Sequence, residues 1–136
     1  MLELRRNLKF EIGPCQHIFI QIDARCDLCQ HQAIQLKIGD MATRCEAAKL
    51  LTESAARAYD KGERCDMEAG MAKLFSSEAA MKNAEECMRI FGGYGYSTEF
   101  PVERLYRDAP LMCIGEGTNE MQRIIISRQQ IARNPA

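Results

Sequence analysis

Two long stretches of the chain carry apolar residues every three or four positions, which is the spacing of one face of an α-helix. The first begins near Gln32 and ends near Gly62, because glycine readily adopts the backbone that closes a helix. We therefore predict one long helix between these two residues. Its apolar stripe consists of Ile34, Ile38, Met41, Cys45, Ala48, Leu51, Ala55 and Tyr59.

The second stretch runs from Asp66 to the glycine pair Gly92 and Gly93. Asp66 is a predicted N-cap, because its carboxylate can accept hydrogen bonds from the free amides of a first helical turn. Helical spacing favours core packing of the methionines in this stretch over an adaptable partner-binding face. The predicted stripe is Met67, Met71, Leu74, Met81, Ala84 and Met88.

Shorter helices are predicted after GGYGYSTEF, a loop of glycines and aromatics. Pro101 can open one of them, Pro110 is expected to interrupt it, and a last helix starts at Thr118. No segment shows convincing strand alternation, so the predicted fold is all-α: an antiparallel helical bundle of two long helices closed by shorter ones. The last helix is expected to bury Met121, Ile124, Ile125 and Ile131.

Length, charge and cysteine content argue against a nucleic-acid-binding, membrane-spanning or secreted protein. A length of 136 residues suits one domain, and a formal charge of -1 with interspersed acids and bases gives no case for nucleic-acid binding. No apolar run is long enough to cross a bilayer, and the first residues lack the features of a secretory signal. Seven cysteines are an odd number, which suits reduced thiols. An intracellular protein is expected.

Residues 1–30 show no clear period and are predicted to be a divergent segment before a bundle over residues 31–136. Thiols and imidazoles in this region raise the alternative of a small zinc site. A second CxxC and a well-spaced histidine pair are absent, so incidental cysteines are favoured and no metal is predicted. The candidate ligands are Cys15, His17, Cys26, Cys29 and His31.

IGEGTNEMQR places Glu116 between Gly115 and Gly117, just before the helix predicted at Thr118. Taken alone, such a glutamate is best interpreted as a solvated turn residue. A catalytic base is the alternative, since flexible glycines and the positive end of a helix can hold a carboxylate beside a developing negative charge.

Four segments together resemble one known family. HQAIQLKIGDMATRCEAAKLL, GMAKLFSSEAAM, RIFGGYGYSTEFPVERLYRDA and IGEGTNEMQRIIISRQ occur in this order. They resemble the C-terminal helical domain of the acyl-CoA dehydrogenases over about residues 31 to 134. GGYGY, PVER, RDA and EGTNE carry most of the specificity, and with them the base becomes the preferred interpretation of Glu116.

The resemblance implies a flavoprotein that removes two hydrogens across the α,β bond of an acyl-CoA thioester. Glu116 would abstract the α-proton, and hydride would pass from the β-carbon to flavin N5. Acyl chain and flavin would exclude water and so raise the pKa of the carboxylate. Gly117 and Arg128 would lie near the acyl-CoA. Relatives of this kind work in the bacterial cytoplasm or the mitochondrial matrix and pass electrons to an electron-transfer flavoprotein or a similar acceptor.

FAD contacts are implied from two subunits, because most family members are dimers of dimers in which FAD also reaches the neighbouring subunit. Thr118 and Glu120 would contact the FAD of their own subunit. Gln32, Arg89 and Gly93 would contact the FAD of the partner.

Three departures from the family pattern change the expectations. Arg89 replaces a frequent glutamine, which would allow a charged contact to the FAD pyrophosphate. Gly115 replaces a frequent tyrosine, which leaves room for a branched, bulky or carboxylated acyl group. The chain also lacks segments resembling the N-terminal helical and middle β domains of the family, and it has an incomplete first helix of the bundle. It is therefore expected to be part of a truncated or split enzyme, inactive alone. The alternative is a non-catalytic helical module that associates with full-length subunits.

Overall fold

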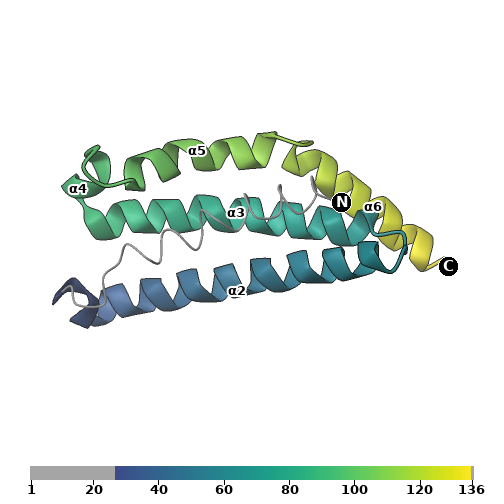
Figure 1. The fold of residues 1–136 in the computed structure, drawn as a ribbon, viewed down its shortest axis with the longest axis horizontal. Helices are drawn as coiled ribbons and strands as arrows, with labels where there is room; N and C mark the ends of the chain where they lie inside the picture. The colour runs from purple at the N-terminus through teal and green to yellow at the C-terminus, as the bar shows by residue number, and fades with distance from the viewer. Residues whose placement is uncertain (1–26, 136) are drawn as a thin grey trace.

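The computed structural model describes residues 27–135, which form helices joined by short connections (Figure 1). No strand occurs in this part of the chain. Two long helices confirm the predicted all-α fold, and shorter helices follow them. In chain order the elements are a 3-10 helix η1 (Asp27–Gln30) and the α-helices α2 (Gln32–Asp60), α3 (Asp66–Phe91), α4 (Gly93–Tyr96), α5 (Val102–Ile114) and α6 (Asn119–Arg133).

Helix α3 is the centre of the arrangement. It runs antiparallel to α2 on one side and packs against α5 and α6 on the other (Figure 1). A glycine with positive φ lies just outside each end of α3: Gly62, at +74°, stands in the α2–α3 connection, and Gly92, at +57°, follows Phe91. Positive φ is accessible to glycine at little cost, which explains why the sequence turns sharply at these two points.

The buried face of α3 is built from small residues and a few polar ones. Because helices cover α3 on two sides, large side chains would keep them apart. The predicted helix is confirmed and its predicted stripe is confirmed in part: Ala84 lies in the core and Met81 and Met88 pack against it, but the methionines are only partly buried. The buried residues are Gly70, Ala72, Lys73, Ser76, Ser77, Ala79, Ala80, Asn83, Ala84, Cys87 and Ile90.

The main apolar core joins α2, α3 and α5. Met41 of α2 and Cys87 of α3 are fully buried there, and Val102 and Ala109 of α5 close the cluster. Burial raises the pKa of the Cys87 thiol to about 11. Cys87 is therefore a neutral packing residue, as expected for a reduced cysteine that substitutes for an apolar side chain.

Three local predictions were wrong. GGYGYSTEF, predicted as a loop, contains the short helix α4. Asp66 is the first helical residue of α3 and pairs with Arg64 at 2.7 Å, while Cys65 occupies the N-cap position. Pro110 lies inside α5, which continues to Ile114. A proline inside a helix removes one backbone hydrogen bond and costs about 3 kcal/mol. Burial of Ala109 and Val102 on the same helix supplies packing that opposes this local preference.

Apolar residues on the outer surfaces also differ from expectation. Met121, Ile124 and Ile131, predicted to be buried, are 48%, 40% and 71% exposed. Helix α6 packs mainly against α3, so its opposite side is left uncovered by the described helices. Further exposed apolar side chains are Leu36 and Leu50 of α2 and Leu111 and Ile114 of α5.

Ion pairs between helices join α3 to α2 and to α6. Lys37 of α2 pairs with Glu86, and Arg133 near the end of α6 donates to Glu68 at 2.7 and 3.1 Å. These hydrogen bonds lower the pKa of Glu86 and of Glu68 below the ordinary value of 4.5. Arg133 correspondingly has a raised pKa, because Glu68 stabilises its charge.

No helix among the described residues is long and apolar enough to cross a membrane.

Acid should destabilise the bundle through these two carboxylates. Because their pKa is lower in the folded chain, each stabilises the fold above its unfolded pKa and loses that contribution as pH falls through the folded pKa. We expect the free energy of unfolding to decline below a pH of about 4.5. Urea unfolding between pH 7 and pH 3 measures this. Glu86→Gln should lower stability at pH 7 and flatten the decline. A matched change of the exposed loop residue Glu63 to Gln should alter neither, and an unchanged slope in Glu86→Gln would contradict the assignment.

Candidate active site at the α5–α6 turn

The turn between α5 and α6 holds Glu116 in an unusual backbone conformation. Helix α5 closes with a hydrogen bond of 2.8 Å from the Gly115 amide to the Leu111 carbonyl. Glu116 then has a φ of +53° and Gly117 a φ of +85°; no other non-glycine residue in the described range has a positive φ. A left-handed conformation costs an L-residue about 1–2 kcal/mol. Such an outlier marks a candidate functional residue, because the surrounding structure must hold it in place.

Gln122 of α6 holds this turn from the side. Its Nε2 donates to the carbonyl of Glu116 at 3.3 Å and to that of Gly117 at 3.4 Å. A Cβ at Gly117 would lie 3.1 Å from the same nitrogen. Glycine suits this position for two reasons: it adopts a positive φ at little cost, and it leaves room for the Gln122 side-chain amide.

Thr118 and Glu120 lie directly after Glu116 and Gly117, at the positive end of α6. The Thr118 hydroxyl caps the helix by accepting a hydrogen bond from the Met121 amide at 3.4 Å. Hydrogen bonds from its own backbone amide and from Thr118 hold the pKa of Glu120 below its ordinary value of 4.5. The charges of Arg123 and Lys73 act in the same direction. The first turn of α6 is therefore a site that favours negative charge.

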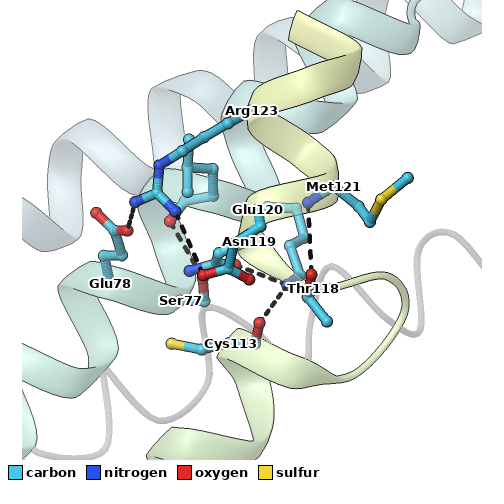
Figure 2. Close-up of polar contacts among 10 residues, drawn as sticks. Ser77, Glu78, Cys113, Thr118, Asn119, Glu120, Met121 and Arg123 are labelled. Carbon is cyan, nitrogen blue, oxygen red and sulfur yellow. Dashed lines mark hydrogen bonds and ion pairs between the residues drawn. The ribbon is translucent and has the colours of Figure 1, made fainter.

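A buried polar cluster, which the sequence did not reveal, supports the turn. Figure 2 shows Ser77, Cys113 and Asn119 converging beside the start of α6. Lys73 donates to Asn119 Oδ1 at 2.8 Å and to the Cys113 carbonyl at 3.3 Å. The Ser77 hydroxyl lies 3.0 Å from the same Asn119 oxygen and 3.1 Å from the Leu74 carbonyl, so its single proton can serve either. The asparagine of EGTNE thus links the start of α6 to α3.

The Glu116 side chain is exposed in this chain. Large apolar side chains stand on both sides of it in the sequence: Ile114, at the end of α5, is 63% exposed, and Met121 is 48% exposed. At Gly115, the position that departs from the family pattern, an added Cβ would meet only the Leu111 carbonyl, at 3.2 Å. Glu116 thus lies in a segment with exposed apolar residues on either side in the sequence.

The predicted contacts to a partner's FAD lie elsewhere. Gln32 opens α2 and is exposed, and Gly93 opens α4 and is exposed. Arg89 lies in the last turn of α3, where its guanidinium pairs with Glu85 at 2.5 Å and with Glu86 at 3.9 Å. These three residues belong to the end of the bundle where α5 begins, whereas Glu116 follows the end of α5 (Figure 1). A helix of 13 residues is about 20 Å long.

Of the predicted site residues, the structure brings four together: Glu116, Gly117, Thr118 and Glu120. Arg128 is exposed on α6, about three turns beyond Thr118, and stands apart from them.

Of the candidate zinc ligands, Cys15, His17 and Cys26 lie outside the described residues. Cys29 and His31 flank the join between η1 and α2. Within residues 27–135, no group of three or more histidines, cysteines and acidic residues is placed to hold a metal ion.

Residues 22–131 match the family described as acyl-CoA dehydrogenase, C-terminal domain. This chain belongs to that family. The match contains every helix of the bundle except the last two residues of α6, and it places the α5–α6 turn within a family of flavoprotein oxidoreductases.

Two curated relatives show how much of a family enzyme the chain represents. An acyl-CoA dehydrogenase of Bacillus subtilis is 52% identical over 101 residues, which are 74% of this chain and 27% of the relative. Cyclohexane-1-carbonyl-CoA dehydrogenase of Geobacter metallireducens is 50% identical over 102 residues, 75% of this chain and 27% of the relative. The chain thus spans about a quarter of the length of these relatives.

A solved structure, described as the electron transferring flavoprotein of Acidaminococcus fermentans, has the same fold. It has a TM-score of 0.81 and is 36% identical to this chain. The likeness covers 91% of this chain and 34% of that one.

Backbone strain at Glu116 can be measured through stability. Glu116→Gly should raise the free energy of unfolding by a few tenths to about 1 kcal/mol, because relief of the left-handed strain exceeds the added entropy of the unfolded chain. Glu116→Val should lower it by more than about 1 kcal/mol, since a β-branched residue tolerates this φ poorly. Glu63→Gly serves as the control at an exposed glutamate without positive φ, and it should lower stability. A stabilisation of equal size at both positions would refute the strain.

Proposed function

We propose that Glu116 is the base of an FAD-dependent α,β-dehydrogenation of an acyl-CoA thioester. The observation that carries this proposal is a glutamate held in the left-handed region between two glycines, at the opening of α6, in a chain of the acyl-CoA dehydrogenase family. No packing need explains a strained, exposed glutamate at this place. A base that must face a substrate explains it, because function is a common reason for retaining strain.

The geometry supplies two of the requirements for removing an α-proton. The carboxylate of Glu116 would accept the proton, and its side chain is free to face a thioester lying over the turn. The N-terminus of α6 favours the negative charge that develops on the thioester oxygen during this step. Gly117 would border the thioester, and Arg128 would act further along α6, where a guanidinium suits the phosphates of CoA.

Several residues fit FAD in their hydrogen-bonding chemistry. Thr118 and Glu120, at the opening of α6, would contact the cofactor of the same subunit through a hydroxyl and a carboxylate. Gln32, Gly93 and the exposed guanidinium of Arg89 would contact the cofactor of a partner, with Arg89 suited to a pyrophosphate. When bound, FAD would supply the acceptor for the hydride that leaves the β-carbon.

The positions of the proposed FAD residues support assembly of several copies of the chain. The two groups of proposed FAD residues lie at opposite ends of α5, about 20 Å apart. We propose that they serve two different FAD molecules in a homo-oligomer. Electrons would then pass to an electron-transfer flavoprotein or a similar acceptor, a proposal supported by a relative of Acetobacterium woodii, 44% identical over 100 residues, which is by its name a subunit of a caffeyl-CoA reductase-Etf complex. The regions that correspond to the remaining three quarters of the relatives would complete the site.

The acyl group is proposed to be bulky or branched. Glycine at position 115 leaves the surface beside the base without a side chain. One relative at 50% identity acts, by its name, on a cyclohexane-1-carbonyl thioester.

A chimera tests the proposed base. Residues 31–134 would replace the matching domain of the Bacillus subtilis relative, and dye reduction by acyl-CoA would be measured. We expect an active flavoprotein, and Glu116→Gln should lower kcat about 10²–10⁴-fold, the usual range for loss of a general base, while the flavin spectrum persists. Glu63→Gln is the matched control and should leave kcat unchanged. An active Glu116→Gln chimera would exclude this glutamate as the base.

A second function, a non-catalytic module that joins full-length subunits, is favoured by one observation. Large apolar residues on the outer faces of α2, α5 and α6 are exposed, among them Leu36, Leu111 and Ile131 at 60% or more. Surfaces of this kind mark interaction sites.

The absorbance spectrum of the purified 136-residue chain separates the two functions. Bound flavin and dye reduction by acyl-CoA favour the enzyme. A colourless chain that co-purifies with a co-expressed full-length subunit favours the module, and we expect the chain alone to be colourless and inactive.

A further inference from the structure

We propose that Lys73 is the positioning residue for Glu116: its ammonium group joins the end of α5 to the start of α6 and thereby sets the turn between them. The catalytic part of this inference rests on the proposed function. Whether Lys73 fixes the turn can be tested without measuring activity.

The contacts of Lys73 place it under the turn. The residue is only 8% exposed, and its Nζ donates to Asn119 Oδ1 at 2.8 Å and to the Cys113 carbonyl at 3.3 Å. Both acceptors are neutral, and no carboxylate within residues 27–135 forms an ion pair with Lys73. An ammonium group can only donate, so the oxygen of the Asn119 amide must face it. The orientation of Asn119 is thereby fixed.

Cys113 and Asn119 stand three residues before and three residues after Glu116. One side chain from α3 therefore fixes both ends of the segment that carries the proposed base. Gln122 holds the middle of the same segment through the carbonyls of Glu116 and Gly117. The strained backbone is thus fixed at three points, and Lys73 supplies two of them.

Packing alone does not account for a lysine here. A methionine would fill a similar volume without the cost of burying a charge, and replacement of buried charges by apolar residues is often neutral or stabilising. Lysine adds directional hydrogen bonds, which a methionine could not form. The Cys113 carbonyl belongs to the last turn of α5, where carbonyls lack helical partners and attract cations. The Asn119 amide separates the ammonium from the positive end of α6, so one cation can join two helix ends of opposite polarity.

Hydrogen exchange in the full chain tests this role. Lys73→Met should accelerate exchange of the amides between Gly115 and Met121 at least about tenfold, while core amides such as those of Ala48 and Cys87 keep their rates. Lys82→Met, a matched change at an exposed lysine of the same helix, should change neither. Two outcomes would overturn the proposal. In one, the turn amides of Lys73→Met exchange at the wild-type rate; in the other, they exchange faster only because the core amides do so as well.

A double variant separates positioning from stability and covers the case in which Lys73→Met does not fold. Lys73→Met/Asn119→Leu removes both partners of their mutual hydrogen bond, and the Ser77 hydroxyl can still donate to the Leu74 carbonyl, so only the Cys113 carbonyl loses its donor and most of the global stability should recover. The turn should nevertheless exchange as fast as in Lys73→Met. Recovery of wild-type protection in the turn would show that Lys73 only fills space, and would overturn the proposal.

Kinetics in the chimera provide the catalytic readout. Lys73→Met/Asn119→Leu should lower kcat about tenfold with little change in KM, because the base is misplaced while the acyl-CoA surface is intact. If kcat were unchanged although the turn amides exchange faster, the catalytic role of Lys73 would be overturned. The Glu116→Gln chimera decides the proposed function separately, because exchange in the turn does not depend on the chemistry of Glu116.

Discussion

A single constraint shapes this structure: α3 is packed on two sides. Small residues let α2 approach on one face and let α5 and α6 approach on the other, as at Gly70, where a Cβ would lie 3.2 Å from Ile126 of α6. The same helix must satisfy the polar groups that its neighbours bring inward. Lys73, Ser77 and Asn83 do this from its buried face: Lys73 and Ser77 bond to Asn119, and Asn83 bonds to the Met41 carbonyl at 3.2 Å and to Arg44 at 3.1 Å. Helix α3 is therefore both the spacer and the polar anchor of the bundle.

Periodicity and glycines predicted the long helices well, because both signals are local. Gly62 and Gly92 have the positive φ that ends a helix, and the helices stop beside them. The faces were predicted less well. A period of three to four residues identifies an apolar stripe, but it cannot show that a helix has neighbours on two sides, so the small residues of α3 were overlooked in favour of Met67 and Met71. Tertiary packing also overrode the local preference of Pro110 for a helix end.

The candidate site was also predicted only in part from the sequence. Glu116, Gly117, Thr118 and Glu120 are close together in the sequence, and a motif that resembles a family pattern finds them together. Lys73 lies 46 residues before Asn119, and no local pattern connects the two. Its only signal was a lysine between Ala72 and Leu74 in a predicted helix, and a single lysine in a helix is easily interpreted as a surface residue. Gln122 was missed for a different reason: its role is to bond backbone carbonyls, and that depends on the φ values of the turn.

Energetics explain why such a support is needed. A left-handed Glu116 costs about 1–2 kcal/mol, which a free turn would relieve by rotating. A typical buried hydrogen bond contributes about 0.5–1.5 kcal/mol, and one to a charged group about 1.5–3 kcal/mol. The bonds from Lys73 to Cys113 and Asn119 are therefore comparable in size with the strain, and those from Gln122 add to them. The turn is thus held by side chains that lie outside the motif. A glutamate in an EGT segment that lacked these partners would have the same residues but no fixed direction, so the motif supplies the carboxylate while α3 and α6 fix its position.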